Sequence, residues 1–248
     1  MSSTSPAANR KRVVISQPMY FPWVGMLEQI QLADIFVFYN DVQFSRGFFH
    51  RVQIKTAQGT PWITIPLRDY HRGQLIADVT VDNRQDWRQK HLALLAAAYR
   101  QAPFRDEMLK LVDRVFAMPL STLAQVSRAS MMGLANYFSL LPGRRFVDSE
   151  SLQAQGSSSQ RLCSIVTELQ SKVYVTGHGA RNYLDHDLFG RNRIAVEYMR
   201  YECHPYPQLH GRFTPYVSAL DLVANCGREG ARYIVSGTQP AREFVETV

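Results

Sequence analysis

Cysteine is scarce in this chain, and long apolar runs are missing from it. Its three cysteines, Cys163, Cys203 and Cys226, are odd in number, and their spacings match no zinc-binding or disulfide framework. Such usage is typical of a reducing compartment. No apolar run resembles a signal peptide or reaches the ~20 residues that a membrane span requires. We therefore expect a cytoplasmic protein that has no membrane span and no metal site.

Acidic residues are fewer than basic ones. The chain contains 28 Lys and Arg against 21 Asp and Glu, which gives a net charge of +7. This surplus favours acidic partners such as nucleotides, phosphates, CoA or an acidic carrier protein. The basic residues are scattered apart from one cluster at Arg10, Lys11 and Arg12, whereas nucleic-acid-binding proteins usually carry a longer basic stripe. The distribution therefore disfavours direct binding of nucleic acid.

What the chain does have is enough apolar residues for a substantial core. Hydrophobic residues make up 46% of 248 residues, a length that suits one domain with an insert. We expect a disordered tail over residues 1–12 and a single α/β domain over residues 13–248. A strongly helical stretch, interrupted near Pro103 and Pro119, predicts a helical insert at about 85–141.

The first third of the domain reads as a strand, a helix and a second strand. Val13–Gln17 and Asp34–Tyr39 are short apolar runs, and Val24–Leu32 has helical spacing. This βαβ unit requires a parallel sheet. The same alternation returns with strands at 145–148, 173–176 and 194–201 and helices at 157–170, 181–189 and 216–225. The pattern predicts a Rossmann-like parallel sheet, to which Phe48–Lys55 and Trp62–Leu67 add a β-hairpin.

Polar residues follow every strand predicted for the sheet core. The strands end in Ser16-Gln17, Asn40-Asp41, Asp148-Ser149 and Thr176–Gly179. Ligands of open parallel sheets bind beyond the carboxyl ends of the strands. A small-molecule site at this edge is therefore expected, although ordinary turn chemistry would also explain polar residues there.

The segment QPMYFPWVG after the first strand combines several ligand-binding residue types. Gln17 offers an amide, and Tyr20 and Trp23 offer flat faces for stacking on a base or sugar. Gly25 would let a ligand approach the start of a helix, where amide groups favour anions. The alternative is a hydrophobic connection between strand and helix.

The segment TGHGARNY after the fourth strand gives a second candidate. Gly177 and Gly179 flank His178 and could present amide groups to an oxyanion or phosphate, and Tyr183 follows as a substrate contact. His178 could act as a general base or could cap a helix; the pattern leaves both open.

Two further groups of polar residues are candidates. After the second strand, Asp41 could orient a histidine or bind an amine beside Gln43. Arg51 and Lys55 would share one face of an extended segment and could meet an anionic ligand, unless that face is simply solvated.

The C-terminal segment YPQLHGRFTPYVSALDLVANCG supplies the last candidates. His210 lies in a glycine-containing loop and could act as an acid or base, and Gln208 could bind substrate. Ser218 and Asp221 share a helix face or form an N-terminal cap. Cys226 is explained more simply by a buried helix end than by nucleophilic catalysis.

Taken together, these segments resemble the signatures of the WbqC-like family. ISQPMYFPWVGMLEQIQLADIFVFYNDVQFSRGFFHRVQIK looks like the opening signature, GTPWITIPL like the next strand, and VTGHGARNYLDHDLF and YPQLHGRFTPYVSALDLVANCG like the C-terminal signatures. The similarity spans roughly residues 13 to 227. The chain departs from the pattern at Phe48-Phe49-His50, and it lacks an Asn after Arg51.

The resemblance implies a role in bacterial surface-polysaccharide (O-antigen) or natural-product biosynthesis. It suggests a transferase that moves an acyl or aminoacyl group from a thioester-type donor to an amino sugar or another small amine. No cofactor is identified, but CoA, a carrier-protein thioester or a nucleotide sugar would suit the basic charge as a substrate. The expected roles are general base for His178 or His210, orienter or amine binder for Asp41, and oxyanion donors at Gly177–Gly179.

Two other functions stay open. The strand, loop and helix at the start also resemble HUP-type nucleotide-activating enzymes, which would make the core HUP-like. The His-x-Gly-His of those enzymes would fall at Trp23-Val24-Gly25-Met26, where both histidines are missing. The third possibility is a non-catalytic partner that holds a biosynthetic intermediate or a carrier protein.

Overall fold

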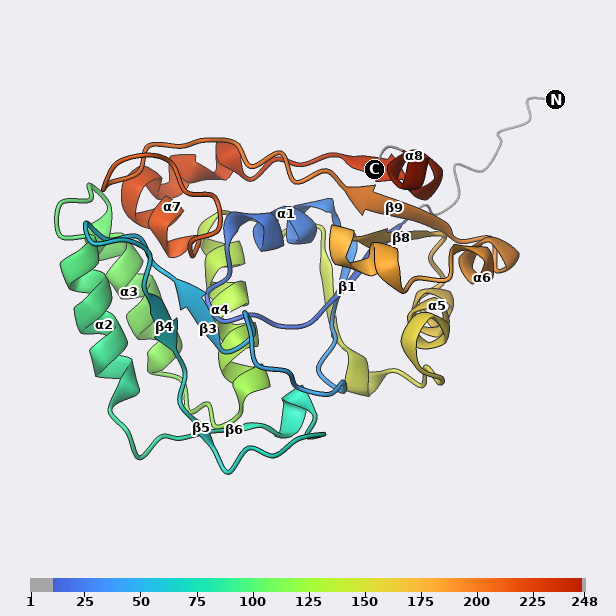
Figure 1. The fold of residues 1–248 in the computed structure, drawn as a ribbon, viewed down its shortest axis with the longest axis horizontal. Coiled ribbons are helices and arrows are strands. Elements are labelled where there is room, and N and C mark those ends of the chain that lie inside the picture. Colours follow the sequence, from blue (N-terminus) through green and yellow to red (C-terminus); the bar gives the residue numbers. More distant parts are fainter. Residues whose placement is uncertain (1–10, 247–248) are drawn as a thin grey trace.

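The computed structural model describes residues 11–246 and has a six-stranded sheet at its centre (Figure 1). Residues 1–10 of the expected tail lie outside the described residues. The strand order is β10-β9-β8-β1-β2-β7, and only β10 runs antiparallel to its neighbour. The strands are β1 (Arg12–Ser16), β2 (Ile35–Phe38), β7 (Arg145–Asp148), β8 (Val173–Thr176), β9 (Ala195–Met199) and β10 (Thr238–Pro240). The expectation of a mostly parallel α/β sheet is confirmed.

Helices cover both faces of the sheet. α1 (Val24–Leu32) connects β1 to β2 on one face, while α5 (Ser158–Glu168) and α6 (His186–Arg191) pack on the other. Alternate strand residues divide between the two cores: Val14 and Phe36 join the α1 side, and Val13 and Ile35 join the α5 side. Because strands such as β2 are buried on both faces, their sequences are continuously apolar.

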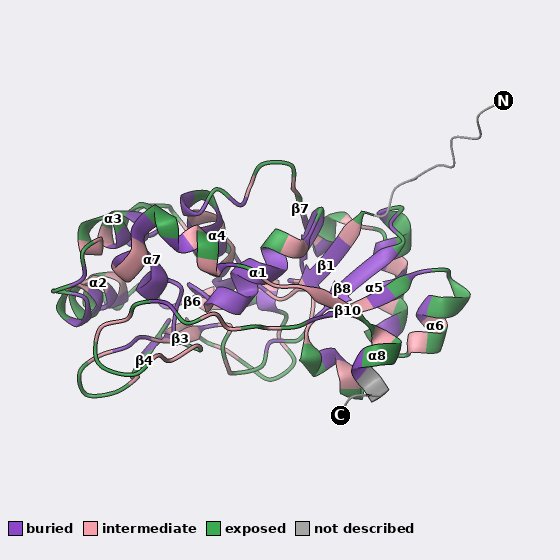
Figure 2. Cartoon of the chain, turned by 90° about the horizontal axis from the view of Figure 1, so that it is seen from above, coloured by how far each residue is buried: buried purple, intermediate pink, exposed green. Residues whose placement is uncertain are grey.

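A second layer of helices extends the α1 face. It consists of α2 (Trp87–Ala98), α3 (Arg105–Phe116), α4 (Leu123–Tyr137) and α7 (Leu220–Cys226). Figure 1 shows these helices on the left and α5 and α6 on the right, and Figure 2 shows the same separation from above. The breaks between α2, α3 and α4 contain Pro103 and Pro119, as expected. This layer shares one continuous hydrophobic core with the sheet.

Small antiparallel pairs complete the fold. β3 (Arg51–Gln53) and β4 (Trp62–Thr64) form the expected hairpin, but both strands are shorter than predicted. β5 (Leu67–Arg68) pairs with β6 (Thr80–Val81), and α8 (Ala241–Glu246) follows β10. The short helices of 3-10 type are Ile76–Asp78, Ser149–Ser151, His178–Asn182 and Gly227–Tyr233. Within residues 11–246, no helix has the length and apolar character needed to cross a membrane.

The sheet reverses its order between β1 and β8. The chain passes from β1 to β2 and β7 in one direction, and then crosses to β8 and β9 on the other side of β1. In parallel sheets, such a reversal opens a crevice at the carboxyl ends of the two strands. Here that position is flanked by Gln17 and by the turn at Gly177-His178.

Candidate functional site

Polar side chains from three strands meet at the carboxyl edge of the sheet. The strand register aligns Ser16, Phe38 and Asp148, so the residues that follow them lie together. Asn40 donates from Nδ2 to Asp148 Oδ1 at 3.3 Å and to Glu150 Oε2 at 3.1 Å. The edge expected from the sequence is therefore present.

Asp41 at this edge is held by an arginine that the sequence patterns did not single out. Its carboxylate accepts from Ser149 Oγ at 2.6 Å and forms an ion pair with Arg161 on α5. On the neighbouring strand, Arg128 of α4 pairs with Asp148 at 3.0 Å. Asp41 therefore orients a hydroxyl and a guanidinium rather than an imidazole, which corrects its expected role as the partner of a catalytic histidine.

His178 lies in the turn that follows β8 and is exposed. Its Nε2 lies 2.7 Å from the Met199 carbonyl oxygen at the end of β9. A carbonyl oxygen only accepts, so Nε2 carries the hydrogen, and in the neutral imidazole the lone pair is on Nδ1. The ring is fixed further by an edge contact with Tyr201, at 5.0 Å between centroids, and by Phe244 at 4.7 Å. This geometry leaves His178 able to accept a proton.

The glycines beside His178 have different surroundings. A Cβ at Gly177 would lie 2.6 Å from Tyr201 Oη, so this position requires glycine for a close approach. A Cβ at Gly179 would meet no atom within 4 Å. Gly177 therefore shapes the contact between the His178 turn and Tyr201, and the oxyanion role of both amides remains a prediction.

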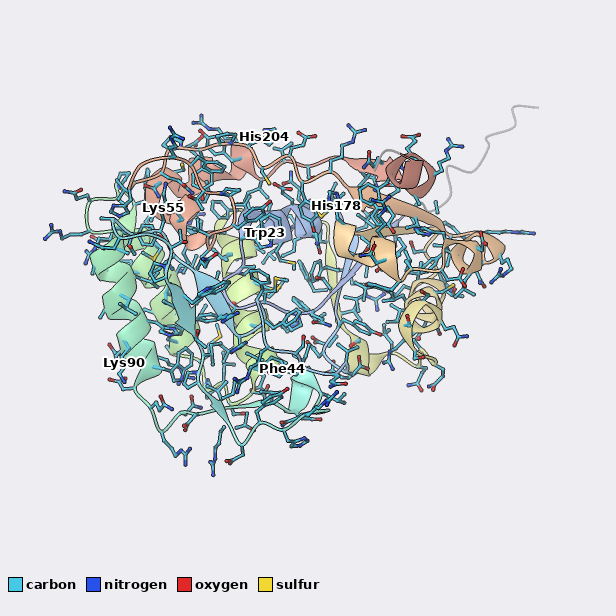
Figure 3. The ribbon with its side chains drawn as sticks, viewed as in Figure 1. Trp23, Phe44, Lys55, Lys90, His178 and His204 are labelled. Atoms are coloured by element: carbon cyan, nitrogen blue, oxygen red, sulfur yellow. The ribbon has the colours of Figure 1, made fainter. Side chains whose placement is uncertain are left out.

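Tyr201 joins the His178 turn to the QPMYFPWVG segment. Its ring stacks on Trp23 at 5.2 Å, and its hydroxyl accepts from Gln29 Nε2 at 2.8 Å. Tyr216 also lies against Trp23, at 5.4 Å. Figure 3 shows Trp23 and His178 close to one another near α1. Trp23, Gly177 and His178 are thus the predicted residues that the fold brings together.

Gly25 does not serve as an anion site. A Cβ there would lie 2.3 Å from the Trp23 indole, which covers this first turn of α1. A phosphate would have to displace the indole to reach the amide groups. The expected ligand approach at Gly25 is therefore wrong, and the glycine instead accommodates Trp23.

Tyr20 and Gln17, from the same loop, have opposite surroundings. Tyr20 is fully buried, and its hydroxyl lies 2.8 Å from His91 Nδ1, so its ring cannot stack on a ligand as expected. Gln17 is partly exposed, and its buried Oε1 has no hydrogen-bond partner among the described residues. Gln17 remains a candidate substrate contact beside the sheet reversal.

Glu28 of α1 was missed by the sequence patterns. It is 1% exposed, and its Oε2 has no hydrogen-bond partner in the described chain. Burial raises the pKa of this carboxyl to about 7; the Ser236 hydroxyl lowers it, and the Glu202 charge raises it. The available signal was a single charge inside the otherwise uncharged helix VGMLEQIQL.

Lys55 and Gln208 form a structural clamp. Lys55 is 4% exposed and donates from Nζ to Gln208 Oε1 at 2.9 Å and to the Arg212 carbonyl at 2.5 Å. Arg51 instead lies over the Trp62 ring at 4.4 Å. The expected anion site shared by Arg51 and Lys55 is therefore absent from the described structure, because β3 ends at Gln53.

The remaining C-terminal candidates support the fold. Ser218 is fully buried and donates to the Phe21 carbonyl at 2.7 Å. Asp221 is also fully buried; burial raises its pKa to about 6, while the hydroxyls of Tyr206 and Tyr99 lower it. Neither residue can contact substrate in this conformation.

His210, Gln43 and Tyr183 lie on the surface. His210 Nε2 is 2.8 Å from the Ala98 carbonyl, and the residue lines a cavity of about 620 Å³ between the hairpin and α2. Gln43 is exposed and forms an isolated antiparallel β-bridge with Leu75. Tyr183 is 57% exposed at the end of the His178 turn. His210 belongs to different surroundings from His178, whereas Tyr183 remains available to a ligand at the sheet edge.

A further cavity of about 880 Å³ runs along α3 and α4. Neither a histidine nor any of the residues predicted as catalytic or substrate-binding lines it. We therefore place the candidate site at the His178 turn, where the strand order of the sheet reverses.

Comparison with known proteins gives two matches. The model of the WbqC-like protein family matches residues 17–233. The uncharacterized protein Rv1507c of Mycobacterium tuberculosis is 31% identical over 228 residues, which cover 90% of this chain and 97% of that protein. No solved structure matches the chain.

Proposed function

Since the chain belongs to the WbqC-like protein family, we propose that it is a transferase whose acceptor is an amino sugar or another small amine. The donor is an acyl or aminoacyl thioester on CoA or on a carrier protein. The setting is surface-polysaccharide or natural-product biosynthesis in the bacterial cytoplasm. The observation that supports this most directly is the Nε2 contact of His178 with the Met199 carbonyl, which makes Nδ1 the acceptor nitrogen of the neutral ring, in a turn fixed at the sheet reversal.

The proposed reaction needs one base at this place. The nitrogen of the amine forms a bond to the thioester carbonyl carbon, and His178 Nδ1 accepts a proton from that nitrogen. The carbon–sulfur bond then breaks, and His178 returns the proton to the departing thiolate. Amide groups at Gly177 and Gly179 would stabilise the charge that develops on the carbonyl oxygen.

We further propose that the mostly parallel α/β sheet belongs to a Rossmann-like, HUP-like core. The reversal of strand order between β1 and β8 supports it, since ligands of such sheets bind at that point. Gln17 and Tyr183 flank this point and are the proposed substrate contacts.

Nucleotide activation of HUP type has less support. The helix start where those enzymes hold phosphates is covered here by the Trp23 indole, which packs against Gly25. We therefore expect no ATP-dependent pyrophosphate exchange. A non-catalytic carrier partner has no specific observation in its favour, and it would make His178 dispensable.

The test is a thiol-release assay with CoA and carrier-protein thioesters over a panel of amines. We expect His178→Ala to reduce turnover by about 10²–10⁴-fold while the melting temperature stays close to that of the wild type. His186→Ala is the matched control, because that imidazole is also held at Nε2, by Tyr198 Oη at 2.9 Å. Equal turnover in wild type and His178→Ala would rule out the proposed base.

A further inference from the structure

A small pocket lies beside Trp23, whose ring stacks on Tyr201 next to the His178 turn. Its lining includes Trp23, Glu28, Cys203, His204 and Phe213. The cavity has a volume of about 10 Å³, which is close to the minimum for one water-sized group. Figure 3 shows Trp23 and His204 on the same side of the molecule.

The pocket contains a carboxylate that has no counterion. Glu28 is 1% exposed, and its Oε2 is buried without a hydrogen-bond partner in the described chain. Burial of an unpaired ionised carboxylate is unfavourable, because the charge loses its hydration without gaining a partner. The Ser236 hydroxyl offers the carboxyl a hydrogen bond, but no cationic side chain lines the described pocket, so a cation that arrives with a ligand would stabilise the ionised form.

The groups around Glu28 favour a cation over an anion. No Lys or Arg lines the pocket. The titratable groups that face Glu28 are Glu202, Cys203 and Tyr201 from the chain after β9, and His204 lies beside them, paired with Glu202 at 3.0 Å. The local charge is therefore negative in a protein whose net charge is +7.

The walls of the pocket suit an ammonium group. The side chains of Trp23, Tyr206 and Phe213 line it, and aromatic faces attract a desolvated cation. An ammonium group is about the size of the water that the cavity would hold. A hydroxyl or an N-acetyl group would leave the Glu28 charge unpaired, and the N-acetyl group would also exceed the space.

We propose that this pocket binds a primary ammonium group of the substrate, with Glu28 as its counterion. The inference builds on the proposed transferase, because it adds a recognition element beside the proposed base. The same chemistry could come from the α-amino group of an aminoacyl donor or from an amino group of a sugar acceptor other than the amine that His178 deprotonates. In either case Trp23 of the pocket stacks on Tyr201, and Tyr201 in turn contacts His178.

Binding of four simple probes tests the proposal at pH 7.5. Glycinamide represents the aminoacyl source and glucosamine the amino sugar; acetamide and N-acetylglucosamine are their neutral counterparts. Calorimetry should show binding of at least one amine and weaker binding, by tenfold or more, of its counterpart. Binding of glycinamide alone would assign the pocket to the donor, and binding of glucosamine alone would assign it to the acceptor.

Variants separate this proposal from the proposed function. Glu28→Gln keeps the side-chain shape and should weaken amine binding at least tenfold, whereas Glu229→Gln, an exposed control, should bind as the wild type does. His178→Ala should retain amine binding while it loses turnover. Unchanged binding in Glu28→Gln, or no binding of either amine, would overturn the ammonium pocket even if transfer is observed; intact binding without transfer would overturn only the transferase.

Discussion

The buried polar groups of this chain differ in whether they have a hydrogen-bond partner. The hydroxyl of Tyr20 meets His91 Nδ1 at 2.8 Å, and Ser218 donates to the Phe21 carbonyl, so both groups are satisfied inside the protein. Glu28 Oε2 has no such partner among residues 11–246. A buried polar group that is satisfied supports the fold, whereas one that is not satisfied and also lines a cavity, as Glu28 does, is a candidate ligand contact.

The raised pKa of Glu28 predicts a dependence of stability on pH. Its folded-state pKa of about 7 exceeds the usual glutamate value of 4.5, so the folded protein binds more protons between these values than the unfolded chain does. We expect the contribution of Glu28 to stability to fall as pH rises from about 4.5 to 7. Glu28→Gln should remove this component, which denaturant titrations of both proteins at pH 5 and pH 8 would measure. An equal change in wild type and variant would contradict the assigned protonation.

The close packing of Trp23 on Gly25 predicts a steric clash when Gly25 is replaced by a larger residue. Ala at this position would place its Cβ about as close to the Trp23 ring as the 2.3 Å found for the built atom, so the indole must move. We expect Gly25→Ala to lower the free energy of unfolding by about 1–3 kcal/mol and to change the Trp23 fluorescence. Gly190→Ala is the control, because a Cβ there meets nothing within 4 Å and α6 should gain slightly.

The site could be predicted from the sequence only in part. His178 was identified because glycines flank it after an apolar strand, and the fold does place it at the sheet reversal. Trp23 and Tyr20 look equivalent in the sequence, but Tyr20 is buried against His91 and Trp87 of α2, whereas Trp23 lies against Tyr201. Tyr201 lies 178 residues after Trp23 in the chain, and no local pattern indicates that the two rings stack.

Among the elements, those with strong periodicity were predicted best. The continuously apolar strands β1, β2 and β8 and helix α1 were expected close to their observed bounds. The helix expected at 216–225 begins only at Leu220. Ser218 is held outside the helix because its hydroxyl donates to the Phe21 carbonyl and its backbone amide donates to the Gln53 carbonyl of β3. The expected helix at 181–189 divides into a 3-10 turn and α6. Such boundaries depend on tertiary hydrogen bonds that the local sequence does not contain.

Helix α4 offers a test of one of its termini. Thr122 Oγ1 accepts from the Gln125 amide at 3.3 Å, and Gln125 Oε1 accepts from the Thr122 amide at 3.2 Å, which makes a reciprocal capping box. Thr122→Ala should lower the free energy of unfolding by about 1 kcal/mol, a decrease of roughly 2–4 °C in melting temperature for a chain of this size. Thr122→Ser should keep most of the stability, and equal losses in both variants would argue against the cap.

In the whole molecule, two hydrophobic cores share one sheet. The larger core joins the strands to α1 and to the helical layer, and the smaller core joins the opposite face of the same strands to α5 and α6. The candidate site lies at the sheet edge, where α1, the His178 turn and the chain after β9 meet. Its geometry therefore depends on both cores.

This shared sheet predicts that the protein unfolds as one unit, in line with the proposal of a single domain with a helical insert. Leu134 of α4 and Ile165 of α5 are each fully buried, in the larger and the smaller core respectively. Truncation of either to Ala should cost about 2–5 kcal/mol. Because both cores pack on the same strands, each variant should shift one common transition in calorimetry and in circular dichroism. Two separate transitions, with Leu134→Ala lowering only one of them, would instead show that the helical layer is an independent folding unit.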